Sequence, residues 1–469
     1  MKKDIKKYVL LSLLSVTFSS FAQEVKAPTD DIPANFRNST ATDTTTIADI
    51  KWEQFFTESD LKHLIDVALI KNNDLQIAEE NMNIANLQYK QTKWGNIPQV
   101  NAGVSAASTR FSDNSLNGFN AQQSLGQHHI EDYTAGLNLS WEIGIWGKIR
   151  SQKKSALASY MQTAEAKKAL QTSIVSNVSK GFYDLLMLDA QLDIAKKTLM
   201  LNDSTLFIVG LQFDAGQVTS LAKDQTEAQR LVAAKLIPEL EQNIQIQENV
   251  LSILTGTFPE AKERESKLHS LLVKENLSIG IPAQLLNRRS DVKSAELALK
   301  AANAKVGIAK ASLYPSLNIT AAAGVNSFES SNWFTIPASL FGSVAGGLTA
   351  PLLNGKKLNT QYKITKVQRE QAVIQFRQTV LVAVGEVSNA LVKIEKQKKQ
   401  YEIANQRVET LKKAIANASM LFKNGMATYL EVIIAQGNLL GAELELASVK
   451  KDRLSSNVEL YHALGGGWE

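Results

Sequence analysis

The sequence predicts a mixed α/β membrane protein in which three chains close a twelve-stranded β-barrel, four strands from each, that continues into a long α-helical barrel. Three observations lead to this prediction: an internal two-fold repeat, two helical stretches of unusual length, and four segments in which apolar and polar residues alternate. The repeat argues against a catalytic domain, and the long helices argue against a globular core. The alternation indicates strands with one face toward lipid and the other toward water.

The chain contains two copies of one unit of roughly 200 residues. Residues 74–101 align without a gap with residues 291–318, so that Asp74 recurs as Asp291. A second block repeats at an offset of 209, where Phe213, Gly216, Thr219, Leu221 and Gly256 return as Phe422, Gly425, Thr428, Leu430 and Gly465. A catalytic domain is rarely built in this way, so a transporter or a pore is the better first hypothesis.

The N-terminus predicts export. Lysines at positions 2, 3, 6 and 7 precede an apolar run at 8–18, and Ser20-Phe21-Ala22 forms a small-residue cleavage site. These are the features of a secretory signal peptide, and the mature chain is expected to begin near Gln23. Nothing later in the chain reaches about 18 consecutive apolar residues, which argues against a helical inner-membrane protein.

Composition excludes several other classes. The chain has no cysteine, so disulfides, a Cys-ligated metal site and the acylated cysteine of a bacterial lipoprotein are not expected. The formal net charge is +5, of which the signal peptide contributes +3 (four lysines and one aspartate), leaving +2 on the mature chain. That balance gives no reason to expect nucleic acid. Membrane attachment must come from the fold, and a lipid-free protein is expected.

Two stretches without proline, 147–213 and 356–421, predict single helices of about 65 residues, or about 100 Å at 1.5 Å per residue. Each ends in a turn, at 213–219 and 422–428, where a glycine suits the left-handed C-cap conformation and a threonine can cap the next helix. Shorter helices are predicted beside them, at 61–96, 219–256, 283–313 and 428–464. Two short helices placed end to end are about as long as one long helix. Each copy is therefore predicted to form an elongated antiparallel layer.

Strands are predicted near 99–111, 132–143, 316–328 and 340–352. The second shows the pattern most clearly, because apolar residues at odd positions from Tyr133 to Ile143 alternate with Thr, Gly, Asn, Ser and Glu. The polar stretches 112–131 and 329–338 suit solvent-facing loops. Strands of about 11 residues are long enough to cross a bilayer when tilted.

The strands must form a closed barrel, because an open sheet would leave unpaired backbone groups in lipid. Two chains would give about eight strands and an interior filled by side chains, whereas three give about twelve and leave a lumen. The sequence therefore favours a homotrimer. The predicted segments are a signal peptide (1–22), an N-terminal extended segment (23–57), the first repeat (58–256), a connecting equatorial segment (257–280) and the second repeat (281–469).

Five motifs occur in a fixed order along the chain. They are WEIGIWGKIR at 141–150, IPAQLLNRRSDVKSAE at 281–296, AKASLYPSLN ending at Asn318, GLTAPLLNGKKL at 347–358 and the closing YHALGGGW. Together they resemble the TolC/OprM superfamily of outer-membrane efflux factors, over nearly the whole mature chain. The resemblance implies a homotrimeric outer-membrane barrel with a periplasmic helical tunnel. It also implies two partners, a periplasmic adaptor protein and an inner-membrane resistance-nodulation-division transporter.

The resemblance assigns a role to the two tip turns. The family's tip motif contacts the helical hairpin of the adaptor, and the matching residues are Phe213, Gly216, Thr219, Phe422, Gly425 and Thr428. An alternative explains the same glycines and threonines as simple caps of a helical hairpin, and it needs no partner.

The resemblance also implies a periplasmic gate. Members of the family often place acidic residues six and nine positions after the second tip glycine, which here are Glu431 and Ile434. One ring of three Glu431 carboxylates is therefore expected, rather than two acidic rings; a solvated helix face remains the alternative. The first copy has Ala222 and Gln225 at these places, so the gate is expected to be asymmetric.

No chemistry of catalysis is indicated. The sequence offers no Ser/His/Asp set, phosphate loop or paired carboxylates that the topology would bring into a cleft, so neither enzyme activity nor a cofactor is expected. His128 and His129 are adjacent in a polar stretch and are interpreted as loop residues rather than metal ligands.

The favoured function is the outer-membrane exit duct of a tripartite efflux pump that passively conducts small molecules such as drugs, dyes and detergents. A type I secretion duct for a protein substrate would use the same fold, although the RRSDV and WGK segments favour efflux. A trimeric coiled-coil adhesin would instead require continuous heptads and a single barrel segment. Which compounds pass is not indicated by the sequence.

Overall fold

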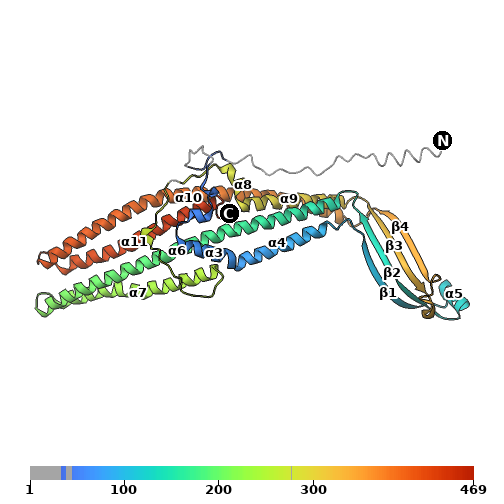
Figure 1. The fold of residues 1–469 in the computed structure, drawn as a ribbon, viewed down its shortest axis with the longest axis horizontal. Coiled ribbons are helices and arrows are strands. Elements are labelled where there is room, and N and C mark those ends of the chain that lie inside the picture. The colour runs from blue at the N-terminus through green and yellow to red at the C-terminus, as the bar shows by residue number, and fades with distance from the viewer. Residues whose placement is uncertain (1–32, 38–44, 276, 469) are drawn as a thin grey trace. The chain divides into compact units, whose positions relative to one another are not determined.

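The computed structural model describes residues 33–37, 45–275 and 277–468 (Figure 1). The predicted signal peptide lies outside these residues, as does much of the predicted N-terminal segment. The elements, in chain order, are η1 (Ile47–Asp49), α2 (Trp52–Phe55), α3 (Ser59–Lys71), α4 (Asn73–Thr92), β1 (Gln99–Arg110), α5 (Leu116–Leu125), β2 (His129–Ile143), α6 (Lys148–Asp214), α7 (Ser220–Leu254), η2 (Leu268–Ser270), η3 (Pro282–Gln284), α8 (Leu285–Arg288), α9 (Ser290–Ala311), β3 (Ser316–Ser327), η4 (Ser330–Asn332), β4 (Leu340–Thr349), α10 (Lys357–Lys423) and α11 (Tyr429–Ala463).

The chain forms two compact units that do not coincide with its two sequence repeats. The first unit contains 84–160 and 297–374, and the second contains 28–83, 161–296 and 375–469. Each unit thus takes residues from both repeats. This division follows from the pairing of elements, because strands and helices of one copy pack against the corresponding elements of the other.

The first unit contains one four-stranded antiparallel sheet in the order β1-β2-β3-β4 (Figure 1). The strands begin and end within three residues of the predicted segments. The central pair joins the two copies, since β2 comes from the first and β3 from the second, with Tyr133 opposite Ser327 and Ile143 opposite Leu317. The expectation of a mainly helical chain with four strands is therefore confirmed.

The prediction of a plain loop at 112–131 is wrong. Ten of these residues form α5, which Ser115 caps by accepting a hydrogen bond from the Gly118 N–H, and which ends at Gly126 with φ of 63°. A serine before a helix and a glycine after it are ordinary start and stop signals, so the sequence held this information. A Cβ at Gly118 would lie 2.2 Å from the Ser112 carbonyl oxygen, so only glycine permits this packing.

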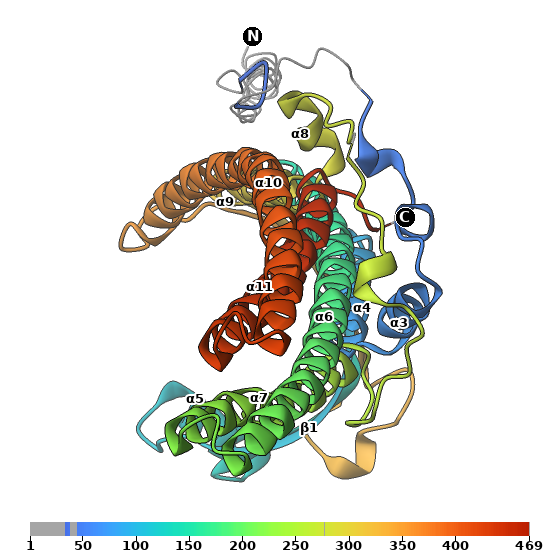
Figure 2. The ribbon, with the colours of Figure 1, turned by 90° about the vertical axis from the view of Figure 1, so that its left-hand side faces the viewer.

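The second unit contains two helical hairpins, formed by α7 with residues 161–214 of α6 and by α11 with residues 375–423 of α10, and their tips face the viewer in Figure 2. The long helices α6 and α10 have 67 residues each, close to the predicted 65, and α7 and α11 have 35 each. Helices α7 and α11 contact each other. Among the described residues, α11 is the one helix long and apolar enough to cross a membrane, but its buried face reflects packing within the unit.

The short helices predicted at 61–96 and 283–313 are wrong as continuous helices. The first is interrupted at Asn72, between α3 and α4, and the second at Arg289, between α8 and α9. Both residues have extended backbones, with ψ of 126° at Asn72 and 117° at Arg289. The two positions correspond under the same offset that aligns 74–101 with 291–318, so the interruption is a repeated feature. We call these two interruptions the joints.

Each joint receives the end of the last helix of its own repeat. The Asn72 side chain donates from Nδ2 to the Leu254 carbonyl over 2.9 Å, and Arg289 donates from Nη1 to the Ala463 carbonyl over 3.0 Å. Leu254 and Ala463 are the last residues of α7 and α11. The last four carbonyls of a helix lack partners within it, so each joint side chain satisfies one of them.

The second joint carries a charge network that the first lacks. The Arg289 guanidinium is 5% exposed and binds the Asp291 carboxylate over 2.6 Å and the Glu386 carboxylate over 2.6 Å. Burial by itself would raise the pKa of Asp291, but the hydrogen bonds and charge of Arg289 outweigh it and hold that pKa below its usual value. A buried arginine thus replaces an amide at the equivalent position.

Candidate functional site

The two tips are built on the same backbone motif. Each long helix is followed by a glycine with positive φ, 72° at Gly216 and 71° at Gly425. The bonds that close the turns run from Gly216 N to Phe213 O (2.9 Å), Gln217 N to Gln212 O (2.8 Å), Gly425 N to Phe422 O (3.0 Å) and Met426 N to Leu421 O (2.8 Å). This pattern is the Schellman motif, which pairs the carbonyls that the helix end leaves free.

The threonines that follow the glycines differ. Thr428 caps α11, because its Oγ1 accepts from the Leu430 N–H over 3.3 Å while its own N–H donates to Glu431 Oε2 over 2.9 Å. Thr219 occupies the same position before α7, yet among the described residues its side chain makes no capping hydrogen bond. The residue matching Glu431 is Ala222, which has no acceptor. The second tip therefore has a complete capping box and the first has not.

Glu431 lies in the first turn of α11 at the second tip, and its carboxylate already accepts hydrogen bonds. The hydroxyl and the N–H of Thr428 both donate to Oε2. The hydrogen bond from the Thr428 hydroxyl holds the pKa of the exposed Glu431 carboxyl below its usual value, so this group is ionised at neutral pH. The observed geometry accounts for Glu431 as a helix cap, and its role at a gate stays a prediction.

The tip phenylalanines occupy different environments. Phe422 is 7% exposed and packs with Val209, Ala222 and Val432 in an apolar cluster to which α6, α7, α10 and α11 each contribute. Phe213 is 36% exposed, and Lys223 Nζ lies 5.5 Å from its ring centre. A partner can therefore touch the ring of Phe213, whereas the ring of Phe422 holds the two hairpins together from within.

A hydrogen bond also ties the two hairpins at the tips. The Tyr429 hydroxyl, at the start of α11, donates to Gln225 Oε1 of α7 over 2.7 Å. The Tyr429 side chain packs against the same apolar cluster as Phe422. Sequence reasoning missed this contact, because it joins segments far apart in the chain.

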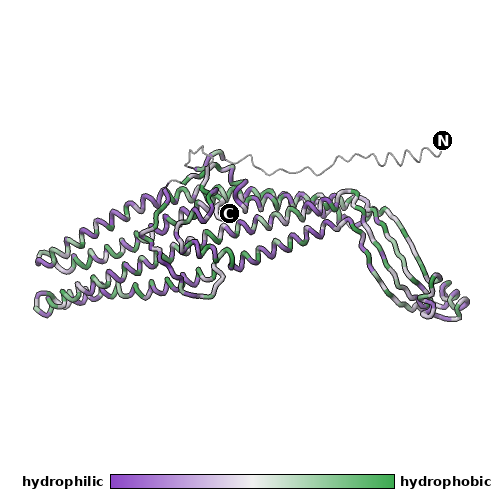
Figure 3. Tube along the Cα trace, in the orientation of Figure 1, coloured by the Kyte–Doolittle hydropathy of each residue, from purple (hydrophilic) through white to green (hydrophobic). Residues whose placement is uncertain are grey.

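The sheet has one apolar and one largely polar face. Paired residues on neighbouring strands share a face, so the register decides which side chains stand together. The apolar face carries Val100, Ala102, Val104, Tyr133, Ala135, Leu137, Leu139, Trp141, Ile143, Leu317, Ile319, Ala321, Ala323, Val325, Leu340, Val344 and Leu348. The opposite face includes Gln99, Asn101, Ser105, Thr134, Asn138, Ser140, Glu142, Asn318, Thr320, Asn326 and Ser343. Hydropathy accordingly changes from residue to residue along the strands (Figure 3).

His128 lies in a loop, as expected, whereas His129 belongs to a strand. His129 is the first residue of β2, and His128 Nδ1 lies 2.9 Å from the Asp113 carboxylate, with His129 Nε2 4.0 Å from Glu131. Each histidine therefore has a carboxylate neighbour, which sequence reasoning did not foresee. In the described part of the chain, no three His, Asp or Glu side chains come together in a way that could hold a metal ion.

The family model of the outer membrane efflux proteins matches residues 64–257 and 281–466, which is most of the chain and follows its two repeats. The chain belongs to this family. Cation efflux system protein CusC of Escherichia coli O6:H1 is 28% identical over 97% of this chain and 97% of its own. Solvent efflux pump outer membrane protein SrpC of Pseudomonas putida is 28% identical over 89% of this chain and 87% of its own.

Solved structures agree with the fold. The crystal structure of CusC matches with a TM-score of 0.82 at 26% identity and covers 96% of this chain and 100% of that chain. The outer-membrane channel MtrE of Neisseria gonorrhoeae matches with a TM-score of 0.85 at 24% identity, over 96% of this chain and 99% of that one. The outer membrane efflux protein described here is therefore a duct of the outer membrane that extends into the periplasm, in a family of channels rather than enzymes.

Proposed function

We propose that three copies of this outer membrane efflux protein form a passive exit duct with a twelve-stranded barrel. The observation that carries the proposal is the two-faced sheet with two open edges: within the described residues, one edge of β1 and one edge of β4 have no strand partner. A sheet whose apolar face meets lipid must pair those edges. Because the strands alternate in direction, β4 of one copy meets β1 of the next in antiparallel pairing, and the polar face lines a lumen.

The tips are the proposed docking points for a periplasmic adaptor. Exposed apolar side chains gather there on both copies, with Phe213 and Leu221 at the first tip and Met426 and Leu430 at the second. A hairpin that presents apolar residues in a fixed backbone shape suits a helical partner. Gly216, Gly425 and Thr428 set that shape, Thr219 stands at the start of α7, and Phe422 supports the shape from the buried side.

Glu431 is the proposed gate residue. In a trimer, three of these carboxylates would form a negative ring that concentrates cations at the periplasmic aperture. The capping box fixes the position of each carboxylate relative to α11. The Thr428 hydroxyl, which lowers the pKa of each Glu431 carboxyl, opposes the mutual repulsion by which three neighbouring carboxylates would raise it.

The proposed cargo is small molecules handed over by an inner-membrane resistance-nodulation-division transporter through the adaptor. The relatives are named for different cargoes, cations for CusC and toluene for the Pseudomonas putida protein TtgI, which is also 28% identical to this chain. The variety of these cargoes supports a duct whose cargo is chosen by the transporter.

Deletion of the gene tests this function. Loss of the duct should raise intracellular accumulation of a fluorescent dye and susceptibility to a panel of dyes, detergents, antibiotics, solvents, copper and silver, and the wild-type gene should restore both. A deletion strain that keeps normal susceptibility to the whole panel but fails to secrete a protein would overturn efflux in favour of type I secretion.

A further inference from the structure

The segment between β3 and β4 forms a closed, uncharged turn. Residues 330–338 read SSNWFTIPA and contain no ionisable side chain. The turn is closed by its own bonds, from Thr335 N to Asn332 O (3.0 Å), Ser339 N to Thr335 O (2.9 Å), Leu340 N to Pro337 O (3.1 Å) and Ser339 Oγ to Asn332 O (2.6 Å). These bonds satisfy the carbonyls of Asn332, Thr335 and Pro337, so the turn enters an apolar medium at a lower cost than an unpaired loop would.

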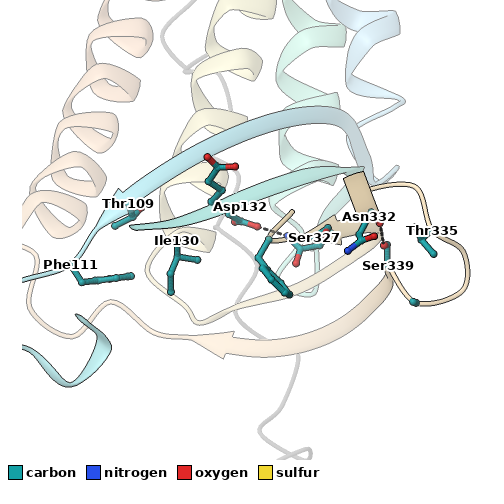
Figure 4. A pocket seen from close by; sticks show the side chains of 12 residues that line it. Thr109, Phe111, Ile130, Asp132, Ser327, Asn332, Thr335 and Ser339 are labelled. Carbon is teal, nitrogen blue, oxygen red and sulfur yellow. Dashed lines mark hydrogen bonds between the residues drawn. The ribbon is translucent and has the colours of Figure 1, made fainter. Parts of the chain in front are cut away.

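The turn has two sides with different neighbours. Asn332, Thr335 and Ser339 line a cavity of about 840 Å³ at the end of the sheet, together with Asp132 on the polar face of β2 and the apolar side chains of Phe111, Ile130 and Phe328 (Figure 4). Trp333 instead packs against Tyr133, with ring centres 5.5 Å apart, and Phe334 follows at 4.9 Å from Trp333.

The aromatic side of the turn continues the apolar face of the sheet. Tyr133 belongs to that face, at the level where β3 ends. Beyond it the turn exposes Phe334, 67% accessible, and Ile336, 65% accessible. Two bulky apolar side chains beside a Trp–Tyr pair are the composition that membrane proteins place at the boundary between hydrocarbon and headgroups.

We propose that the turn 330–338 is a lipid-binding element: Trp333, Phe334 and Ile336 enter the outer leaflet, while Asn332 and Thr335 stay on the aqueous side. The proposal rests on the proposed function, because it needs the apolar face of the sheet to meet lipid. It goes further in assigning lipid contact to a segment outside the strands. The partner is a lipid surface, since residues 330–338 carry no ionisable side chain and their aromatic side continues that face. The Glu131 carboxylate, which accepts a hydrogen bond from the Tyr133 hydroxyl over 2.5 Å, places this side at the level of the lipid headgroups in the proposal.

Spin labels can test the proposal, because the chain has no cysteine and each introduced one is unique. Nitroxide-labelled Phe334→Cys, Thr335→Cys and Val344→Cys would be compared in the full protein, reconstituted in phosphatidylethanolamine–phosphatidylglycerol vesicles. Val344 lies on the apolar face of β4 and is 81% exposed, so it reports the lipid face itself. The measurement is the ratio of collisions with oxygen, which partitions into lipid, to collisions with a water-soluble nickel chelate.

The expected result is a high oxygen-to-nickel ratio at 334 and 344 and a low one at 335. A high ratio at 344 with a low one at 334 would overturn the lipid-binding turn and leave the barrel intact. Protection of 334 from both reagents would mean that protein covers the turn, which also overturns the proposal. A low ratio at 344 would overturn the lipid-facing sheet of the proposed function, and the turn with it.

Discussion

At the scale of single residues, the tip glycines adopt a positive φ that other residues rarely adopt, although the space around them would admit a side chain. Gly425 has a φ of 71°, and a Cβ built on it would meet no described atom within 4 Å. Any penalty for substitution therefore comes from the backbone rather than from a clash. Positive φ is readily available to glycine, whereas a β-branched residue loses on the order of 1 kcal/mol or more.

We therefore expect Gly425→Val to abolish efflux while the protein still reaches the outer membrane at normal levels. A loss of this size distorts one turn but cannot unfold helices of this length. Gly216→Val should act in the same direction, more mildly, because the first tip lacks the capping box. The measurement is dye efflux together with the amount of outer-membrane protein.

Gly441→Ala is the matched control, because Gly441 lies within α11 without a positive φ and also has open space at its Cβ. Alanine there should leave efflux unchanged and gain helix propensity of up to about 1 kcal/mol. Normal efflux in both tip variants would mean that the tips are ordinary hairpin turns and that the adaptor docks elsewhere.

Glu431 offers a second residue-scale test, since glutamine separates its two roles. Gln can complete a capping box but carries no charge, whereas Ala does neither. If the negative ring matters, Glu431→Gln should reduce the cation preference of the duct in planar bilayers as much as Glu431→Ala does. Conductance indistinguishable from wild type in Glu431→Gln, with a change only in Glu431→Ala, would assign Glu431 to capping alone.

The same residue has a defined pH dependence. Its folded pKa lies below the usual value, so the capping contribution is present above the unfolded pKa of about 4.5 and is lost as pH falls through the lower folded value. We expect the protection factors of the amides at the start of α11, which compare each exchange rate with its intrinsic rate at the same pH, to fall as the pH drops below about 4.5 in the wild type and to show no such step in Glu431→Gln.

At the scale of elements, the joints show that the two repeats solve one problem with different chemistry. Both place a side-chain donor against the carbonyl of a helix that ends beside the joint, but Asn72 is neutral and Arg289 brings two carboxylates with it. Breaking a buried ion pair by removing one partner costs about 3–5 kcal/mol, more than the roughly 1–3 kcal/mol of an unsatisfied neutral group.

We expect Arg289→Met to lower the free energy of unfolding by about 3 kcal/mol, near the low end of that range, because Asp291 and Glu386 retain partial access to solvent. Asn72→Ala should cost less, about 1–3 kcal/mol. The measurement is the denaturation midpoint of the purified protein.

Arg407→Met is the control: Arg407 and Glu445 are both about half exposed, and such pairs contribute about 0–1 kcal/mol. Equal losses at 289 and 407 would contradict the structural role of the second joint.

The joints also mark what the sequence could and could not reveal. The long helices and strands were predictable because proline-free composition and alternation are local signals, and the tip turns were predictable from Gly216 and Gly425. The interruption at Arg289 was not, because arginine is no helix breaker and its partners lie in α10 and α11. Asn72 is different, because its Oδ1 accepts from the Leu75 N–H over 3.1 Å and so caps α4, a local signal that sequence reasoning overlooked. The burial of Phe422 and its contrast with Phe213 likewise depend on how two hairpins meet, which identical motifs cannot distinguish.

At the scale of the whole molecule, a duplicated sequence has produced two units that each draw on both copies. One copy supplies β1 and β2 and the other supplies β3 and β4, so neither builds the sheet alone. In the same way, one chain does not complete the barrel, because the two outer strands of its sheet each have an unpaired edge in the described part of the chain. One edge of β1 and one edge of β4 lack partners among the described strands, and they run in opposite directions, as the ends of an antiparallel barrel segment must.

The number of chains follows from the space inside the barrel. Four strands from each chain make eight in a dimer, whose interior side chains fill, and twelve in a trimer, which leaves a lumen for cargo. We therefore expect native mass spectrometry of the protein in detergent to show a trimer, and chemical cross-linking to give a ladder that stops at three. A stable monomer or dimer as the sole species would contradict the lumen, because neither could pair both open edges around a water-filled path. If the trimer forms but conducts no ions in planar bilayers, the channel is blocked at a point outside the barrel strands. The periplasmic tips, where α6, α7, α10 and α11 share their apolar cluster, are the most direct place for that block.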